Sequence, residues 1–263
     1  MPAFTDAPGL PRSVVARALL ILGQFSVAAP ALTISEISRS TGLPVATVFR
    51  LLGELEAGDF VERSSGGRYR LGKRLWEMGL LTPLHGRVRE TALPFLLNLQ
   101  YKTRQTVQFA IPDDLTALYI EKLTDEESVP LQSRIGARIP LHATGLGKAI
   151  LAFSDTPTQD HILTAPLAQF TPQTQTNPDQ LTCELHAIRE QGYATSAEEY
   201  LPGSTSIAAP VLVDGIVQAG VGLVNYQLDP NLERFTEPLL HAAQGISQRL
   251  QELGEQDFPS LHA

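Results

Sequence analysis

The chain has 263 residues, of which 43% are hydrophobic and 18% are charged, and its net charge is −8. This length predicts one or two globular domains with an ample core, and the composition excludes a disordered chain. The single cysteine, Cys183, excludes a disulfide framework and a cysteine-rich metal site. No apolar run approaches the ~20 residues of a membrane helix, and no signal peptide is visible. We therefore expect a soluble, cytoplasmic protein without a membrane partner.

Charge is distributed unevenly along the chain. Residues 1–85 contain nine Lys or Arg and seven Asp or Glu, whereas residues 86–263 contain eleven and twenty-one. Residues 64–74 carry four basic residues and no acidic one. A small basic segment on an acidic body is typical of a protein that contacts nucleic acid with one domain only. Chance clustering on a solvated surface is the alternative.

The chain begins with a proline-rich arm over residues 1–12, which we expect to be flexible. Ser13 is placed to cap a helix that runs to about Phe25. The apolar face predicted for this helix comprises Val14, Ala18, Leu19 and Leu22.

Two further helices are predicted next. Thr33 and Glu36 have the spacing of a capping box, and the short helix that they begin ends at Gly42. Pro44 occupies a favoured first position of a second helix, which runs to about Ala57. Two helices joined by a short turn that contains Gly are typical of a helix-turn-helix.

A β-hairpin is predicted after these helices. Residues 60–63 and 68–71 alternate as strands do, and the turn 64–67 separates them. Three helices and a basic hairpin indicate a winged helix-turn-helix, a DNA-binding domain over residues 13–72.

The second helix of the helix-turn-helix predicts which side chains face a DNA major groove. At 100° per residue, one face is apolar and is expected in the core: Val45, Val48, Leu51, Leu52 and Leu55. The opposite face carries Ala46, Phe49, Arg50 and Gly53, with Thr47 at its edge. Arg50 is the one side chain there that can contact guanine through two hydrogen bonds. Ala46 and Phe49 offer apolar contact, and Thr47 can hold a phosphate.

Further candidate DNA contacts flank this helix. Arg68 and Arg70 alternate with Tyr69 on the hairpin, so both face the same side and suit phosphate or minor-groove contact. Ser13 and Arg17 are candidates on the first helix. In the alternative interpretation, Phe49 is a core residue, the arginines are merely solvated, and the winged helix is degenerate or binds a protein.

The remainder of the chain predicts an α+β domain, one antiparallel sheet with helices against it, over residues 85–255. A linker helix over 73–84 precedes it, and residues 256–263 form a tail. Pro83 and Pro94 are expected to begin or break helices. Residues 136–143 are expected to form a loop. The predicted strands are 106–111, 115–122, 129–133, 193–198, 206–213 and 216–224, and the predicted helices are 144–153, 157–164, 178–191 and 231–253.

No motif in this region supports catalysis, a metal or a cofactor. The loop 143–149 contains glycines and a lysine, but it lacks the first glycine and the Ser/Thr of a phosphate-binding loop. The six histidines show no metal-binding spacing, and Cys183 has no cationic neighbour that would activate it. Glu198 and Glu199 are adjacent, so on a strand they would point to opposite faces as hydrogen-bonding or interface groups. We therefore expect a protein that is not an enzyme.

Several segments in order resemble the IclR-type transcriptional regulators over about residues 12–253. They are SVVARALLIL, TISEISRSTGLPVATVFRLL, DFVERSSGGRYRLG, IPLHATGLGKAILA and GYATSAEEYLPGSTSIAAP. The resemblance implies a winged helix, a dimerising linker helix and a C-terminal effector-binding domain with a GAF-like fold. It also implies a homodimer or tetramer that binds an inverted-repeat operator in double-stranded DNA and responds to a small aromatic or carboxylic acid.

The resemblance also implies which residues bind the effector. They are Leu131, His142, Ala143, Thr144, Gly145, Leu146, Ser196, Ser206, Gly222 and Val224. The family commonly has Asp, Cys and two Ser at the last four positions. The replacements predict a less polar pocket and a larger or more apolar effector; a pocket that no longer senses an effector is the alternative.

The start of the helix near Thr144 suits an effector carboxylate. Thr144 can cap this helix, and free N–H groups of residues 145–147 together with the helix dipole would attract an anion. A tight glycine turn that serves packing alone is the competing interpretation. In the recognition helix, the family commonly reads Lys-Ser-Thr-Val-His-Arg where this chain has Val45–Arg50, so we expect a different operator.

Overall fold

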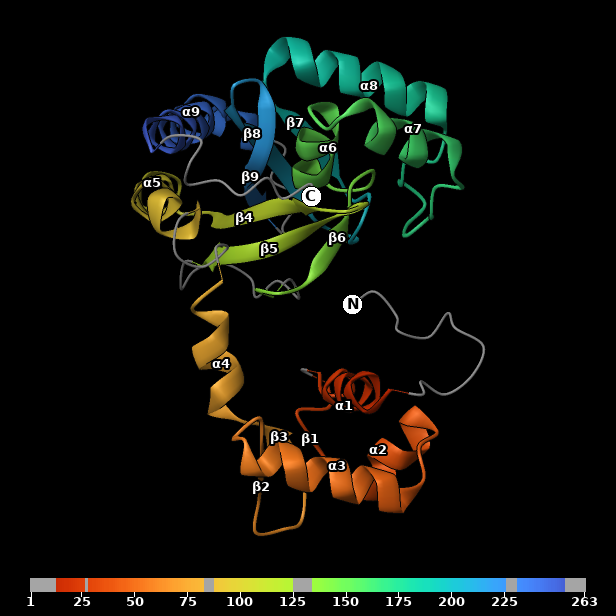
Figure 1. The fold of residues 1–263 in the computed structure, drawn as a ribbon. Helices are drawn as coiled ribbons and strands as arrows, with labels where there is room; N and C mark the ends of the chain where they lie inside the picture. The colour runs from red at the N-terminus through yellow and green to blue at the C-terminus, as the bar shows by residue number, and fades with distance from the viewer. Residues whose placement is uncertain (1–12, 27, 83–87, 125–133, 226–230, 254–263) are drawn as a thin grey trace. The chain divides into compact units, whose positions relative to one another are not determined.

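The structure is a computed structural model that describes residues 13–26, 28–82, 88–124, 134–225 and 231–253. The chain divides into two compact units, residues 1–82 and 83–263 (Figure 1). No helix in the described ranges is long and apolar enough to cross a membrane.

The first unit is a winged helix-turn-helix, as the sequence predicts. Its helices are α1 (Val14–Leu22), α2 (Ile34–Thr41), α3 (Val45–Ala57) and α4 (Lys73–Gly79). Its antiparallel sheet has the strand order β1-β3-β2, from β1 (Ala31–Leu32), β2 (Val61–Arg63) and β3 (Tyr69–Leu71). The sequence does not predict β1, because two residues are too short to show a strand period. The core of the unit consists of Ile21, Phe25, Ile37, Leu43, Val48, Leu51, Leu52, Val61 and Tyr69.

The predicted capping box is present and ties α2 to the hairpin. The Thr33 hydroxyl accepts the N–H of Glu36 at 3.2 Å, and the Glu36 carboxylate accepts the N–H of Thr33 at 2.7 Å. The N–H of Thr33 and its hydroxyl, at 2.9 Å, both donate to the Glu36 carboxylate and lower its pKa. The stabilisation that these two bonds give is therefore present above the usual carboxyl range and is lost as the pH falls through the lowered pKa. Arg68 donates to the same carboxylate and to the carbonyl of Ala31, both at 3.0 Å.

The buried faces of α1 and α3 differ in part from the prediction. Ser13 occupies the N-cap of α1, but its side chain makes no capping hydrogen bond, and the helix ends at Leu22 rather than Phe25. Val14 and Leu19 are exposed and Ile21 is buried instead. Val45, which was predicted to be core, is 54% exposed. It is the first residue of α3 and lies at the edge of the apolar stripe.

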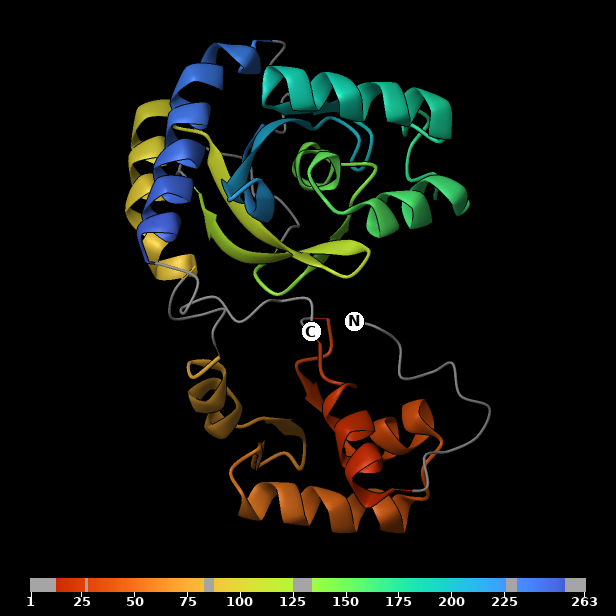
Figure 2. The same cartoon turned by 45° about the horizontal axis from the view of Figure 1, so that its top comes forward.

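The second unit contains a six-stranded antiparallel sheet with the order β6-β5-β4-β9-β8-β7. The strands are β4 (Thr106–Asp113), β5 (Thr116–Leu123), β6 (Arg138–Pro140), β7 (Ala194–Ala197), β8 (Thr205–Val213) and β9 (Ile216–Asn225). Helices α5 (Glu90–Thr103) and α9 (Thr236–Glu252) lie side by side on one face (Figures 1 and 2). Helix α6 (Gly145–Ala152) packs on the other face, with α7 (Thr156–Thr164) and α8 (Pro178–Gln191) outside it.

Side chains alternate between the two faces of this sheet with the period of two that strands impose. Phe109 of β4, Ala209 of β8 and Val221 of β9 belong to the core under α5 and α9. Ala110 and Ala208 belong to the core around α6. The even-numbered residues of β4 and β8 therefore face α6.

The structure corrects several boundaries in this unit. Arg138–Pro140 forms β6, where a loop was predicted, because it pairs with Thr116–Leu118 of β5. Pro94 lies inside α5, where packing of the helix outweighs one missing hydrogen bond. A 3₁₀ turn, η2 (Leu232–Phe235), precedes α9. The strand predicted at 129–133 lies outside the described residues.

Helix α6 approaches the sheet so closely that its glycines are required for packing. A Cβ added at Gly145 would lie 2.7 Å from Ser206 Oγ, and one at Gly147 would lie 2.4 Å from the carbonyl oxygen of Pro140. Gly220 and Gly222 of β9 leave room for Leu146, since added Cβ atoms would lie 3.0 and 3.2 Å from it. Close packing therefore accounts for the glycines at the start of α6, and a phosphate-binding role is not needed to explain them.

Two Gly→Ala substitutions in helices should have opposite effects. A Cβ at Gly53 of α3 meets nothing within 4 Å, so Gly53→Ala should stabilise the first unit by about 0.5–1 kcal/mol through the helix propensity of Ala. Gly147→Ala should destabilise the second unit by about 1–3 kcal/mol, because the neighbouring backbone must move.

Hydrogen exchange of the α3 and α6 amides in the full chain, together with urea unfolding, measures both changes. Faster exchange of the α3 amides in Gly53→Ala would contradict this interpretation of the packing. Unchanged exchange of the α6 amides in Gly147→Ala would contradict it as well.

Candidate functional site

Helix α3 presents one exposed face in the first unit. Ala46, Phe49, Arg50 and Gly53 are exposed, and Thr47 is half-buried. Phe49 is 58% exposed, so it is not a core residue. This face therefore offers one guanidinium and one large apolar ring, together with small side chains that permit close approach.

The candidate arginines of α3 and the hairpin pair with carboxylates on the surface of this unit. Arg50 pairs with Glu54 one turn later in α3, and Arg70 pairs with Glu62 across the hairpin at 2.8 Å. Exposed ion pairs of this kind contribute little, ~0–1 kcal/mol, so a phosphate can replace the carboxylate at small cost. Arg68 differs, because its bonds to Glu36 and Ala31 hold the hairpin against α2.

The two candidates on α1 lie at its start. Ser13 is exposed and Arg17 is half-buried.

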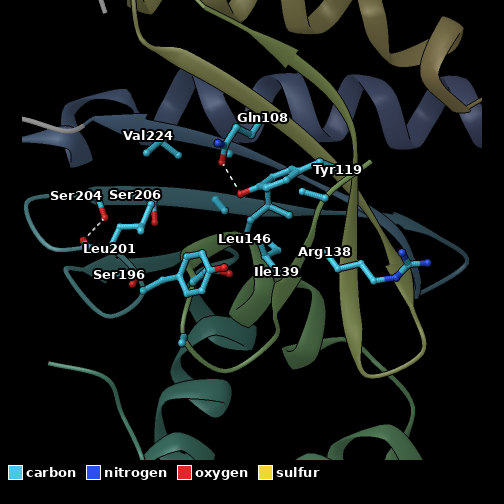
Figure 3. Close-up of a pocket in the computed structure, with 16 residues that line it drawn as sticks. Gln108, Tyr119, Arg138, Ile139, Leu146, Ser196, Leu201, Ser204, Ser206 and Val224 are labelled. Atoms are coloured by element: carbon cyan, nitrogen blue, oxygen red, sulfur yellow. Dashed lines mark hydrogen bonds between the residues drawn. The ribbon is translucent and has the colours of Figure 1, made fainter. Parts of the chain in front are cut away.

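The second unit contains a cavity of about 200 Å³ between α6 and the sheet (Figure 3). Of the candidate effector-binding residues, the cavity is lined by Ala143, Thr144, Leu146, Ser196, Ser206, Gly222 and Val224. Further lining residues are Gln108, Tyr119, Ala137, Arg138, Ile139, Tyr200, Leu201, Ser204 and Ala208.

Three candidates are not among the lining residues. The buried ring of His142 lies 2.9 Å from the carbonyl oxygen of Ala168 through Nε2, so its side chain is engaged elsewhere. The N–H of Gly145 donates to Ser206 Oγ at 3.3 Å. Leu131 lies outside the described residues.

Register places the floor of the cavity on one face of the sheet. Ser196 of β7 is opposite Ser206 of β8, which is opposite Val224 of β9. In the adjacent row, Gly222 of β9 is opposite Gln108 of β4. Because residues two apart share a face, these two rows form one continuous surface beneath the start of α6.

The hydroxyls of Ser196, Ser204 and Ser206 gather at one end of the cavity (Figure 3). Thr144 caps α6 there, with its Oγ1 accepting the N–H of Gly147 at 2.9 Å. Two of the three N–H groups expected to be free at this helix start are thus bonded, to Ser206 and Thr144. The Ser204 hydroxyl donates to the carbonyl oxygen of Leu201 at 2.6 Å, and the Thr144 hydroxyl donates to that of Pro140 at 3.1 Å. The donors available to an anion at this end are therefore mainly the hydroxyls of Ser196 and Ser206.

Tyr119 and Gln108 form a second polar group in the cavity. The phenol of Tyr119 donates to Gln108 Oε1 at 2.9 Å (Figure 3). Burial, reinforced by the nearby Tyr200, raises the pKa of Tyr119 well above its usual range. Tyr119 therefore remains a neutral hydrogen-bonding group at every physiological pH.

Among the described lining residues, Arg138 alone carries a charge, and it pairs with Asp113. In Figure 3 its guanidinium extends away from the serines. The cavity thus combines apolar walls with neutral donors and acceptors, which suits a small organic molecule with a ring and a few polar atoms.

Sequence reasoning missed Gln108, Tyr119, Tyr200 and Ser204. Gln108 could have been found, since a glutamine between Val107 and Phe109 in an apolar strand needs a polar partner. Tyr119 lies on β5, and Tyr200 and Ser204 lie in the loop after β7. Their approach to the cavity depends on the curl of the sheet and on loop geometry, which no local pattern encodes.

The groups considered for other chemistry have separate roles. Glu198 and Glu199 follow β7 rather than continuing it, and their carboxylates diverge to the N–H of Gly203 and to Lys148. Cys183 is exposed on α8. Within the described residues, no group of three or more His, Cys, Asp or Glu could hold a metal ion.

Comparisons with known proteins agree with both units. Residues 14–65 match the family model of the IclR helix-turn-helix domain, and residues 84–248 match that of the bacterial transcriptional regulator IclR C-terminal domain. The chain is 34% identical over 242 residues to the HTH-type transcriptional regulator XynR of Escherichia coli K12, covering 90% of this chain and 96% of XynR. It is 34% identical over 211 residues to the transcriptional repressor AllR of the same strain, covering 79% of this chain and 78% of AllR.

Solved structures give the same result. An IclR homolog from Microbacterium hydrocarbonoxydans in complex with 4-hydroxybenzoate has a TM-score of 0.85 and 32% identity, covering 91% of this chain and 100% of that one. The IclR of Thermotoga maritima has a TM-score of 0.76 and 29% identity, covering 90% and 98%. The chain belongs to the IclR family of bacterial transcriptional regulators.

Proposed function

We propose that this regulator reads an inverted-repeat operator through α3 as a homodimer in the cytoplasm, and that a single-ring aromatic carboxylic acid in the cavity changes its affinity for the operator. The observation that carries the DNA-reading part is the exposed face of α3. Packing does not require an exposed Phe49 and Arg50 on a helix whose core contacts are made by Val48, Leu51 and Leu52 on the other face.

The size and chemistry of the cavity support the class of effector. Its volume of about 200 Å³ corresponds to about seven molecules of liquid water, which suits one ring with small substituents. Leu146, Ile139 and Val224 offer apolar contact to a ring, whereas the hydroxyls of Ser196 and Ser206 can receive a carboxylate. The related structure with 4-hydroxybenzoate supports this class.

Exposed apolar side chains support the homodimer. Trp76 of α4 is 68% exposed and Leu81 just after it is 85% exposed, while Val15 and Leu19 are exposed on α1. Large exposed apolar groups in one small unit are typical of an interaction surface. A second copy of the chain is the partner that an inverted repeat requires.

Selection of DNA from the organism's own genome and from a random pool, with and without benzoate and 4-hydroxybenzoate, tests the proposal. An enriched inverted repeat whose recovery changes with an acid is expected. If the folded protein enriches no sequence at low salt, the winged helix does not read DNA, and the protein is a ligand-sensing or protein-interaction module.

Arg50→Ala should reduce discrimination between the selected operator and random DNA. Loss of a base contact made through two hydrogen bonds should lower the free energy of discrimination by about 1–3 kcal/mol. Fluorescence anisotropy with both DNAs measures it. Arg70→Ala is the matched control. It should weaken binding to both DNAs equally and reduce the salt dependence of binding by about one counterion. An equal loss on both DNAs for Arg50→Ala would remove its base-reading role.

Val224→Phe should abolish acid binding, because a larger side chain fills the small cavity. Ile216→Phe is the control on the same strand, since Ile216 is exposed and does not line the cavity. Calorimetric titration with 4-hydroxybenzoate and benzoate measures the affinity, and DNA binding without acid should be retained. Equal acid binding by wild type and Val224→Phe would place the effector elsewhere.

Trp76→Glu should dissociate the dimer, because a charge replaces an exposed apolar contact. Sedimentation velocity should show a monomer, with weakened binding to the inverted repeat and retained weak binding to a half-site. Leu97→Glu, an exposed apolar position on α5, is the control. A dimer that survives Trp76→Glu with unchanged stability would exclude α4 from the interface.

A further inference from the structure

Lys148 is a buried charge that lies beside the cavity without lining it. Its side chain is 3% exposed in the middle of α6, two residues after Leu146, which does line the cavity. It lines a neighbouring polar hollow that shares Ser196 with the cavity. A buried ammonium is costly unless it is paired, so the groups that pair with it indicate what it holds in place.

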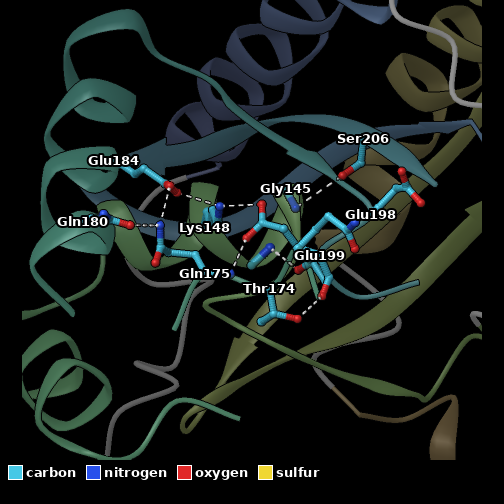
Figure 4. Close-up of polar contacts among 12 residues, drawn as sticks. Gly145, Lys148, Thr174, Gln175, Gln180, Glu184, Glu198, Glu199 and Ser206 are labelled. Atoms are coloured by element: carbon cyan, nitrogen blue, oxygen red, sulfur yellow. Dashed lines mark hydrogen bonds and ion pairs between the residues drawn. The ribbon is translucent and has the colours of Figure 1, made fainter. Parts of the chain in front are cut away.

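Two carboxylates pair with Lys148 at nearly equal distances (Figure 4). Its Nζ lies 2.7 Å from Glu199 Oε1 and 2.6 Å from Glu184 Oε2. The two partners differ in burial and in place. Glu199 has a 10% exposed side chain and follows β7, whereas Glu184 is 39% exposed on α8.

Glu199 belongs to the segment 198–204, which forms one wall of the cavity. Tyr200, Leu201 and Ser204 of this segment line the cavity. The segment turns back on itself at Glu198, which has a φ of 58° and accepts the N–H of Gly203 at 2.9 Å. A left-handed backbone at a residue other than glycine persists only where its surroundings hold it.

The attachments of Glu199 hold this turn from two sides. Its carbonyl oxygen accepts the Thr174 hydroxyl at 2.6 Å, and its carboxylate accepts Lys148 and, at 3.3 Å, the N–H of Gln175 (Figure 4). Lys148 is the one of these partners that comes from α6, whose first turn forms the opposite wall. The Lys148–Glu199 pair thus joins two walls of the cavity through groups that do not touch its interior.

We propose that Lys148 is a positioning residue for effector binding: it holds the 198–204 wall against α6 through Glu199 and thereby sets the affinity of the cavity for its ligand. This inference rests on the proposed function of the cavity. A buried ion pair is weak evidence for stability, because apolar residues of similar volume often replace one without loss. Its effect is therefore expected in the geometry of the wall.

Three substitutions separate positioning from general stabilisation. Glu199→Gln weakens the bond between Lys148 and the wall and keeps the side-chain shape. Glu184→Gln is the matched control, because it weakens an equally short bond of the same ammonium to a carboxylate on α8, whose bond toward the wall is a long one of 3.5 Å from Gln175 Nε2. Lys148→Met removes both bonds. Hydrogen exchange of the ligand-free full-length protein and calorimetric titration with 4-hydroxybenzoate are the two measurements.

In Lys148→Met and Glu199→Gln, residues 198–204 should exchange faster and the acid should bind at least about threefold more weakly, on the scale of coupling within one side-chain network. Glu184→Gln should alter exchange in α8 and near Gln175, and it should leave exchange of 198–204 and the affinity unchanged. Adding Lys148→Met to Glu199→Gln should weaken binding little further, because both act through one bond.

Two outcomes would overturn the inference: unchanged exchange of 198–204 in Glu199→Gln, or an equal loss of affinity in Glu184→Gln and Glu199→Gln. If Lys148→Met fails to fold, the Glu199→Gln and Glu184→Gln pair decides. If the wild type binds no acid, the proposed effector class fails, and the exchange of 198–204 alone decides whether Lys148 holds the wall.

Discussion

The close approach of α6 to the curled sheet is the constraint on which the rest of the second unit depends. Gly145 and Gly147 allow the helix to contact β8 and the Pro140 backbone, and Gly222 makes room for Leu146. The helix is buried along its whole length, so every polar group on it needs a partner. The cavity is the space that remains where its first turn meets the serines of the sheet.

Polarity in the cavity is arranged without an unpaired charge among its described lining residues. Its hydroxyl, phenol and amide groups are neutral, and Arg138 is paired with Asp113. Neutral donors cost less to desolvate than a lysine or arginine would, so small changes in wall geometry should decide which acid binds. This makes the segment that carries Tyr200 and Ser204 important for specificity, although its anchors lie outside the cavity.

Most of the fold followed from local patterns, and the exceptions have physical causes. The capping box at Thr33 and the Gly42 end of α2 are local hydrogen-bonding features, and both are present. Val45 and Leu19 were misplaced because the edge of an apolar stripe is buried only if a neighbour covers it. The ion pairs of Lys148 had no local signal, since its partners lie 36 and 51 residues away in the chain.

The central claim is that occupancy of the cavity and binding of the operator are thermodynamically linked. Linkage requires reciprocity, so the factor by which an acid changes operator affinity must equal the factor by which the operator changes acid affinity. Both factors can be measured by titrating the full-length protein with the selected operator and with the benzoate-series acid that most raises its melting temperature. The account predicts two equal factors that differ from one. An acid that binds tightly with both factors equal to one would contradict it.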